Sequence, residues 1–219
     1  MSAVKNRHDH HAPGTLIRHA RFYDLFAPVV TLGRARRIRE AILTRAALSF
    51  GERVLDVGCG TGTLAMEIRK KVGSEGVVHG IDASPEMVAL AKEKAAARQL
   101  DIGYKVAAAQ HLPFEDGSFD AILCTMVMHH LPRDQRADAI AEMFRVLVPG
   151  GRALIVDLSR EGGLLARMNP IVLLHGQQSL ETIREVEDLI RKRGFQEVAT
   201  GALGFGSLGY VLGRKAAAT

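Results

Sequence analysis

Residues 53–62 have the sequence RVLDVGCGTG, and this stretch decides the fold of the chain. Residues 54–57 are short and mostly apolar or β-branched, which is typical of a strand buried on both faces. Three glycines follow at alternate positions, where a backbone without Cβ atoms can bend tightly and lie against a ligand. Residues 63–71 have apolar side chains on one face and Lys or Arg in the last turn, which predicts a helix. A strand, a glycine turn and a helix N-terminus in this order predict a nucleotide-type pocket.

The spacing of the glycines narrows the kind of nucleotide. The dinucleotide fingerprint is G-x-G-x-x-G, and in this chain Thr63 stands at the position of its third glycine. The chain has G-x-G-x-G instead, preceded within the strand by the acid Asp56. A carboxylate at this place would repel a pyrophosphate but can attract an ammonium group.

This stretch resembles the first motif of the class I S-adenosylmethionine-dependent methyltransferases, D-x-G-x-G-x-G. The resemblance implies that the loop cradles the methionine half of the cofactor, and that the acid contacts its amino end directly or through water. The alternative is a glycine-rich turn that binds no ligand. The candidate cofactor-binding residues of this motif are Asp56, Gly58, Cys59, Gly60, Thr61 and Gly62.

Length and composition favour one domain of moderate size, because 219 residues with a hydrophobic share of 47% provide an ample core. No apolar run approaches the roughly 20 residues of a membrane-spanning helix, and the first residues do not resemble a signal peptide. The two cysteines, Cys59 and Cys124, are far apart and match no metal spacing, so we expect no metal site. A reducing, cytoplasmic setting fits this cysteine usage.

The net charge of +5 is mildly basic, and arginines gather at residues 34–39. The simplest interpretation is a solvated helix face, while transient contact with an anionic lipid surface or an acidic substrate is the alternative. Nucleic acid is not expected as a partner, because only 5% of residues are aromatic and no base-stacking motif is present.

The N-terminal region divides into a tail and a predicted helical lid. Residues 1–14 are polar and end in Pro13-Gly14, so we expect a disordered tail before a single domain over residues 15–219. Residues 15–50 carry two helical patterns, the second over residues 31–49. The methyltransferase resemblance makes Tyr23 a candidate lid residue near the cofactor's carboxylate, with simple packing as the alternative.

Residues 77–82 predict the second strand, and Asp82 stands at its carboxyl end. An acid about 20 residues beyond the glycines can accept hydrogen bonds from both ribose hydroxyls. Ala83 leads into Ser84 and Pro85, which are typical of a helix start. Met87 lies just inside this helix, where it rests against adenine or ribose or simply belongs to the core.

Residues 102–106 predict a short third strand, and residues 107–120 resemble the family stretch G-D-A-x-x-L-P-F-x-x-x-S-F-D. One departure concerns adenine recognition. The family usually has Asp or Asn at the position of Ala108, and that side chain accepts a hydrogen bond from the adenine amino group. Gln110 and the backbone of Ala109 are the candidate substitutes.

Residues 120–127 predict a central fourth strand, whose carboxyl end lies beside the glycine loop in this fold. We therefore expect Thr125 and Met126 to face the sulfur that carries the methyl group. Residues 128–132, MHHLP, resemble the family's exit from this strand, L-H-H-L-P. His130 and, less favoured, His129 are candidates for a general base or for orienting the acceptor, and the alternative is that they pack or cap the next helix.

The remaining pattern completes the sheet. An amphipathic helix over residues 135–147 leads through a Pro-Gly-Gly turn into a fifth strand at 153–157, which ends the cofactor-binding core of residues 51–158. The family commonly inserts acceptor-binding elements at the place of residues 159–179, although a plain packing helix fits as well. Residues 180–219 predict a final helix and two edge strands that form an antiparallel hairpin.

The sequence thus predicts an α/β fold: a Rossmann-like seven-stranded sheet, mostly parallel with an antiparallel C-terminal hairpin, and helices on both faces. The resemblance is strongest to ubiquinone/menaquinone C-methyltransferases and phosphatidylethanolamine N-methyltransferases. It implies methyl transfer from S-adenosylmethionine, with S-adenosylhomocysteine as product, to an O, N or C nucleophile of a small quinone-like or lipid acceptor. A homodimer is compatible with the sequence. A non-catalytic cofactor-binding relative and a nucleotide-dependent oxidoreductase are the alternative functions.

Overall fold

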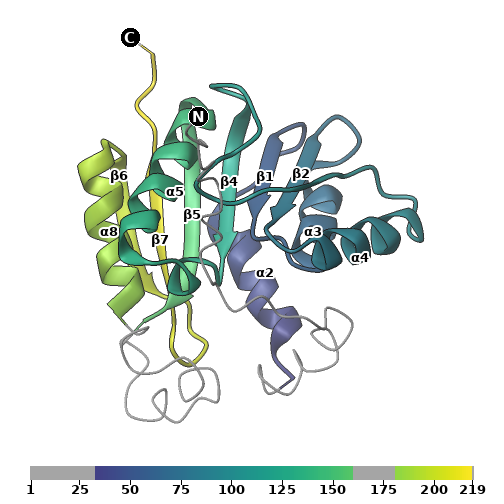
Figure 1. Ribbon diagram of the computed structural model, residues 1–219, viewed down its shortest axis with the longest axis horizontal. Coiled ribbons are helices and arrows are strands. Elements are labelled where there is room, and N and C mark those ends of the chain that lie inside the picture. Colours follow the sequence, from purple (N-terminus) through teal and green to yellow (C-terminus); the bar gives the residue numbers. More distant parts are fainter. Residues whose placement is uncertain (1–32, 160–180, 219) are drawn as a thin grey trace, which may run out of the picture.

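A seven-stranded sheet runs through the middle of the protein (Figure 1). The computed structural model describes residues 33–159 and 181–218. The strand order is β3-β2-β1-β4-β5-β7-β6, in which the first five strands are parallel and β7 is antiparallel to both of its neighbours. The strands are β1 (Arg53–Val57), β2 (Val77–Asp82), β3 (Gly103–Val106), β4 (Phe119–Thr125), β5 (Leu147–Leu158), β6 (Gln196–Ala202) and β7 (Leu208–Arg214).

Helices cover both faces of the sheet (Figure 1). On one face, α2, α3 and α4 pack on side chains such as Val54 and Leu154. On the other face, α5 and α8 pack on the side chains that alternate with these, such as Leu55 and Ile155. Burial on both faces explains why the central strands are almost wholly apolar. The helices are α2 (Ala35–Ala46), α3 (Thr63–Val72), α4 (Pro85–Ala96), α5 (Arg133–Val146) and α8 (Thr182–Arg193), with a 3₁₀ turn η1 (Met128–His130).

The central strand β1 lies at the point from which the chain first adds strands on one side and then on the other. From β1 the chain proceeds outward to β2 and β3, and then crosses to β4 on the other side of β1. Ligands of open parallel sheets bind outside the carboxyl ends of the strands at such a reversal. The ends of β1 and β4 lie side by side there, since Val57 pairs with Cys124.

The predicted fold class is confirmed, and most predicted elements lie where the sequence indicated. Strand β2 has the predicted bounds, and α4 begins as its capping residues require, with the Ser84 hydroxyl accepting from the amide of Met87 at 3.2 Å. Helix α2 is shorter than predicted, because Ala47 has a φ of +47° and ends it. The C-terminal hairpin is present, with its second strand β7 inserted between β5 and β6.

Strand β5 begins six residues before its predicted start. Leu147 already pairs with Phe119, and the strand continues through the Pro-Gly-Gly turn despite a register shift. The residues predicted to form a disordered tail and a first lid helix with Tyr23, and residues 160–179 of the predicted acceptor-binding insertion, lie outside the described residues. No helix within residues 33–159 and 181–218 is long and apolar enough to cross a membrane.

Candidate functional site

The glycine loop joins the end of β1 to the start of α3. Gly58, Gly60 and Gly62 have φ values of +71°, +52° and +76°, which L side chains rarely adopt. The loop is fastened to the neighbouring strand, since the amide of Cys59 donates to the carbonyl of Ile81 at 2.8 Å. The backbone therefore has the tight bend that the alternating glycines predict.

The three glycines have different surroundings. A Cβ on Gly58 would lie 2.1 Å from the Val127 side chain, and a Cβ on Gly62 would lie 2.4 Å from the Tyr104 hydroxyl. A Cβ on Gly60 would meet no atom of the described residues within 4 Å. Packing within the protein therefore requires glycine at the first and third positions, and the middle position borders open space that a ligand can enter.

Asp82, at the end of β2, holds the loop in place. One carboxylate oxygen accepts from the amide of Gly60 at 2.9 Å, and the other accepts from the amide of Ser84, also at 2.9 Å. A carboxylate has about four acceptor sites, so both oxygens keep capacity for further donors such as ribose hydroxyls. Ala83 next to it is exposed, and Met87 is buried at the start of α4.

Asp56 is buried beneath the loop, with 1% of its surface exposed. The backbone of Ala65, in the first turn of α3, donates a hydrogen bond to it. Its Oδ2 atom is buried and has no hydrogen-bond partner among the described residues. Burial, and next the nearby charge of Asp82, raise the pKa of Asp56 from 3.8 to about 7. An incompletely satisfied carboxyl group of this kind fits a cationic group bound at the loop.

Residues that the sequence analysis did not select fasten the loop from outside. The Lys94 ammonium, on α4, donates to the hydroxyls of Thr61 and Thr63, both at 2.9 Å. The Tyr104 hydroxyl, on β3, donates to the carbonyl of Gly62 at 3.3 Å. Neither residue lies in a motif of its own, so only the structure could show these contacts. They make the buried Thr61 a part of the loop's support.

The carboxyl end of β4 carries local strain beside the loop. Met126 has a φ of +59°, which is unusual for a residue with a side chain, and its amide donates to the carbonyl of Val156 at 2.8 Å. The Thr125 hydroxyl is buried without a hydrogen-bond partner in the described part of the chain. Strained backbone and unsatisfied polar atoms concentrate at functional sites. These two residues therefore lie at the carboxyl end of β4 with features typical of a site, and their place facing the methyl-bearing sulfur stays a prediction.

The two histidines of η1 differ sharply in environment. His129 is bound to Asp157 of β5 through its Nδ1 at 2.7 Å and its backbone amide at 3.3 Å, and the two side chains are 1% and 0% exposed. His130 is exposed, and its ring lies against that of His129 with centroids 3.9 Å apart and ring planes tilted by 40°. The sequence placed Asp157 only at the end of a strand. The structure makes it the anchor of the histidine turn.

The loop after β3 carries the predicted adenine contacts. Ala109 is buried, and the Gln110 amide donates to the Gln135 side chain of α5 at 2.6 Å. Ala108 is exposed. The Gln110 amide group is therefore directed toward α5, and the backbone of Ala109 stays the other predicted substitute for the usual Asp or Asn.

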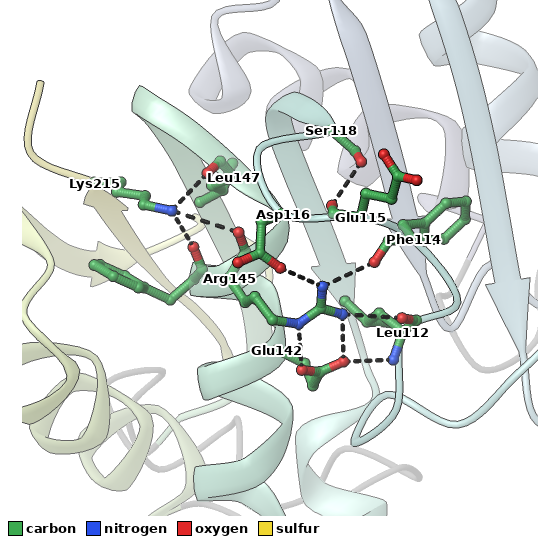
Figure 2. Close-up of polar contacts among 10 residues, drawn as sticks. Leu112, Phe114, Glu115, Asp116, Ser118, Glu142, Arg145, Leu147 and Lys215 are labelled. Carbon is green, nitrogen blue, oxygen red and sulfur yellow. Dashed lines mark hydrogen bonds and ion pairs between the residues drawn. The ribbon is translucent and has the colours of Figure 1, made fainter. Parts of the chain in front are cut away.

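Arg145 of α5 holds the continuation of this loop (Figure 2). Its guanidinium donates to the carbonyls of Leu112 and Phe114 at 3.0 and 2.8 Å, and to the Asp116 carboxylate at 2.8 Å. Glu142 neutralises it with two contacts of 2.7 and 2.8 Å, and also accepts from the amide of Leu112 at 2.8 Å. Residues 112–116 are thus joined to the C-terminal end of α5 by backbone hydrogen bonds and by the Arg145–Asp116 ion pair.

Comparisons with known proteins identify the family. The model of a methyltransferase domain matches residues 54–151, which include the glycine loop and the histidine turn. The demethylmenaquinone methyltransferase of Deinococcus radiodurans is 38% identical over 135 residues, and that of Lactiplantibacillus plantarum is 31% identical over 159 residues. The crystal structure of a SAM-dependent methyltransferase from Aquifex aeolicus superposes with a TM-score of 0.66 at 25% identity, covering 80% of this chain and 88% of that one. The chain belongs to the class I S-adenosylmethionine-dependent methyltransferases.

The predicted family is therefore confirmed, and the two curated relatives carry names of the predicted quinone branch. The matches cover 62% and 72% of this chain, and the chain spans 55% and 66% of the length of these relatives. The matched domain ends before Asp157. The anchor of the histidine turn therefore lies outside the residues that the family model matches.

The fold gathers the predicted methyltransferase site at one edge of the sheet. The glycine loop, Asp56, Asp82 and the end of β4 lie around the reversal point, and the histidine turn lies beside β5. Tyr23 lies outside the described residues. Within the described ranges, no three His, Cys, Asp or Glu side chains are arranged to hold a metal ion. Cys59 and Cys124 are both buried free thiols.

Proposed function

We propose that the protein transfers a methyl group from S-adenosylmethionine to an O, N or C nucleophile of a small, lipophilic acceptor by in-line displacement. The observation that carries the proposal is the buried Oδ2 atom of Asp56, which has no hydrogen-bond partner within residues 33–159 and 181–218 and lies under a loop whose middle glycine borders open space. An ammonium group satisfies such an oxygen, whereas a pyrophosphate would be repelled by it.

The cofactor-holding roles follow from the chemistry of each group. Asp56 is proposed to hold the ammonium end, the backbone of residues 58–62 the methionine half, and Asp82 the ribose hydroxyls. Thr125 and Met126 lie on the side of the reacting methyl group, while Met87, Ala83, Ala109 and Gln110 border the nucleoside. Tyr23 is proposed as the lid residue at the carboxylate end.

Alignment and exclusion of water are the main tasks of this site. When bound, S-adenosylmethionine supplies a methyl group on a positively charged sulfur, which keeps the electron pair of the broken carbon–sulfur bond while the nucleophile forms the new bond. Holding two reactants in line converts the reaction into an effectively intramolecular one, so no nucleophile of the protein is required.

His130 is proposed to orient the acceptor or to take its proton, because it is the exposed ring of the histidine turn. His129 is proposed to support it, because its side chain is buried and bound to Asp157. Replacing His130 by Ala is expected to lower turnover at least tenfold while the affinity for S-adenosylhomocysteine stays within twofold. Steady-state kinetics and calorimetric titration check the two halves of this prediction, and unchanged turnover would contradict the proposed role.

A quinone-like acceptor is proposed, with a phospholipid amine as the alternative. The support is the name demethylmenaquinone methyltransferase that two relatives carry. A lipophilic acceptor of this kind fits transient contact of the protein with a membrane surface. A cytoplasmic location and a homodimer belong to the same proposal.

Titration with S-adenosylhomocysteine, followed by an assay with labelled S-adenosylmethionine, tests the function. The acceptor panel contains a reduced, short-chain demethylmenaquinone, phosphatidylethanolamine and a catechol, and NAD(H) is the control ligand. We expect saturable binding of S-adenosylhomocysteine, label in the quinol, and no thermal shift with NAD(H). A silent titration would overturn the proposal. Binding without methyl transfer to any acceptor in a cell extract would favour a non-catalytic relative, for which the exposed Ala108 is the specific observation.

A further inference from the structure

We infer that Arg136 and Asp157 are positioning residues that fix His130 by holding the histidine turn from two sides. The inference rests on the proposed function, because it assigns these residues a role in the same reaction. Neither residue belongs to the predicted site, and both are buried. Each is argued to act through the turn that carries His130.

Arg136 holds the turn from the side of α5. It is 9% exposed, and its Nε donates to the carbonyls of Met128 and Leu131 at 2.8 and 3.1 Å. These two carbonyls stand immediately before and after the histidine pair. One guanidinium nitrogen therefore binds both ends of the short segment that carries the two rings.

Glu185 of α8 fixes the guanidinium in turn. Its carboxylate forms an ion pair with Arg136 and a second one, at 2.9 Å, with Arg133. The first pair is largely buried, since the Arg136 side chain is 10% exposed and that of Glu185 is 27% exposed. Helices α5 and α8, which pack on the same face of the sheet (Figure 1), are thereby both linked to the turn through Arg136.

Asp157 holds the turn from the side of the sheet. Its carboxylate is fully buried and accepts from the ring and the amide of His129, and from the amide of Leu158 at 2.7 Å. A buried carboxylate is costly unless donors of this kind satisfy it. The end of β5 is therefore joined to the turn by a contact that leaves His129 one orientation.

These contacts determine the orientation of the exposed ring. A three-residue 3₁₀ turn has poor hydrogen-bond geometry of its own, so its position depends on side chains that bind it. The His130 ring lies against the ring of His129, which Asp157 holds, with the ring centroids 3.9 Å apart and the planes tilted by 40°. Since a displacement of about 1 Å at a reacting group can cost on the order of a hundredfold in rate, loosening the turn should be visible in turnover.

The chain contains a matched control for Arg136 at the opposite end of the sheet. Arg152 is 7% exposed, donates to the carbonyls of Ala46 and Ala47 at 2.6 and 2.7 Å, and forms two contacts of 2.8 Å with Glu52. It thus makes the same kind of contacts as Arg136, with two backbone carbonyls and one glutamate. Its place in β5 is next to Ala121, near the start of β4 and far along the strand from Thr125.

A double-mutant cycle with His130→Ala tests the inference. Arg136→Met, Asp157→Asn and Arg152→Met are each made in the wild-type and His130→Ala backgrounds and assayed well below their unfolding midpoints. We expect Arg136→Met and Asp157→Asn to lower kcat at least tenfold in the wild-type background and less than twofold in the other. The Kd for S-adenosylhomocysteine should stay within twofold. Arg152→Met should lower the unfolding midpoint but change kcat less than twofold in both backgrounds.

Two further measurements test the inference if a variant folds poorly or no methyltransferase activity is found. Glu185→Gln weakens the Arg136 ion pair without emptying the site, and it should lower kcat in the same direction. NMR of the histidine rings should show one sharp His130 signal in the wild type and broadening in Arg136→Met but not in Arg152→Met.

Equal losses of kcat in both backgrounds, or an equal loss in Arg152→Met, would show that Arg136 contributes only general stability and would overturn the inference. An unbroadened His130 signal in Arg136→Met would overturn it as well. Failure of the proposed function looks different, because the wild type itself would then not bind S-adenosylhomocysteine or transfer label.

Discussion

Two glycines of the loop, Gly60 and Gly62, differ in the atoms that surround them. Gly60 and Gly62 both have positive φ values, but only Gly62 is packed against side chains, those of Tyr104 and Ala91. Gly60 therefore leaves room for a ligand to approach, whereas Gly62 is needed for the packing of the loop itself. Backbone conformation alone costs a substituted residue about 1–2 kcal/mol at either place.

We therefore predict that alanine at Gly60 mainly weakens ligand binding, and that alanine at Gly62 causes the larger loss of stability. Gly60→Ala should lower the free energy of unfolding by the backbone cost alone but weaken S-adenosylhomocysteine binding at least tenfold, because its methyl group enters the open space. Gly62→Ala should be less stable by roughly a further 1–3 kcal/mol, since its Cβ would lie 2.4 Å from the Tyr104 hydroxyl. Denaturant unfolding and calorimetry measure the two effects. Equal stability of the two variants would contradict the assignment.

The sequence predicted candidate cofactor-binding residues but not the contacts that hold them in place. Asp82 was identifiable because its spacing from the glycines is set by one strand and one helix. Lys94 and Asp157 were not selected, because their partners Thr61 and His129 are 33 and 28 residues away. Contacts between distant parts of the chain leave no local pattern of residue types.

At the scale of elements, helices and strands were predicted well where neighbouring residue types determine them. Ser84 and Pro85 set the start of α4, and the apolar run of β4 is buried as expected. The early start of β5 and the place of β7 were not predictable, because both depend on which neighbour a strand pairs with. The final hairpin could be recognised from the sequence, while its order in the sheet required the structure.

The contact between α5 and the loop after β3 leads to a prediction at this scale. Arg145→Met should lower the free energy of unfolding by about 1–3 kcal/mol, because the carbonyls of Leu112 and Phe114 lose their charged donor. It should also weaken S-adenosylhomocysteine binding several-fold, since Ala109 and Gln110 precede the released segment. Thermal unfolding and calorimetric titration measure both changes.

Arg53→Met is the control for this prediction. Arg53 pairs with Asp120 through contacts of 2.8 and 3.1 Å, but 44% of its side chain is exposed and it lies at the start of β1. Exposed ion pairs contribute little, so its loss should change stability by less than about 1 kcal/mol and leave ligand affinity unaltered. An Arg145 variant that binds S-adenosylhomocysteine like the wild type would mean that the loop does not shape the site.

In the whole molecule, the features that stabilise the fold and those of the candidate site lie at different places along the strands. The two faces of the sheet are closely packed with apolar side chains, whereas one edge concentrates the features that cost stability. Asp56 is buried with an unpartnered oxygen, Thr125 has an unpartnered hydroxyl within the described residues, and Met126 has strained backbone. Such a distribution is typical of a protein whose core supports a site that is not optimised for stability.

Asp56 makes the stability of the whole ligand-free protein dependent on pH. Its pKa is about 7 in the folded protein against a usual 3.8, so between these values the folded state binds more protons than the unfolded chain. The free energy of unfolding therefore falls as the pH rises toward 7 and is constant above it. Asp56→Asn removes this term, so the variant should gain about 3 kcal/mol relative to the wild type between pH 5 and pH 8.

Binding of S-adenosylhomocysteine should stabilise the wild type more than the Asp56→Asn variant. An ionised Asp56 is needed to pair with the ammonium end of S-adenosylhomocysteine, so the thermal shift caused by this ligand should grow from pH 6 to pH 8 in the wild type and stay small and flat in Asp56→Asn. Burial lowers the pKa of His79, but that group is present in both proteins and cancels in the comparison. Parallel stability curves for the two proteins between pH 5 and pH 8 would show that Asp56 does not titrate in this range in the ligand-free state, and would contradict the raised pKa of this group.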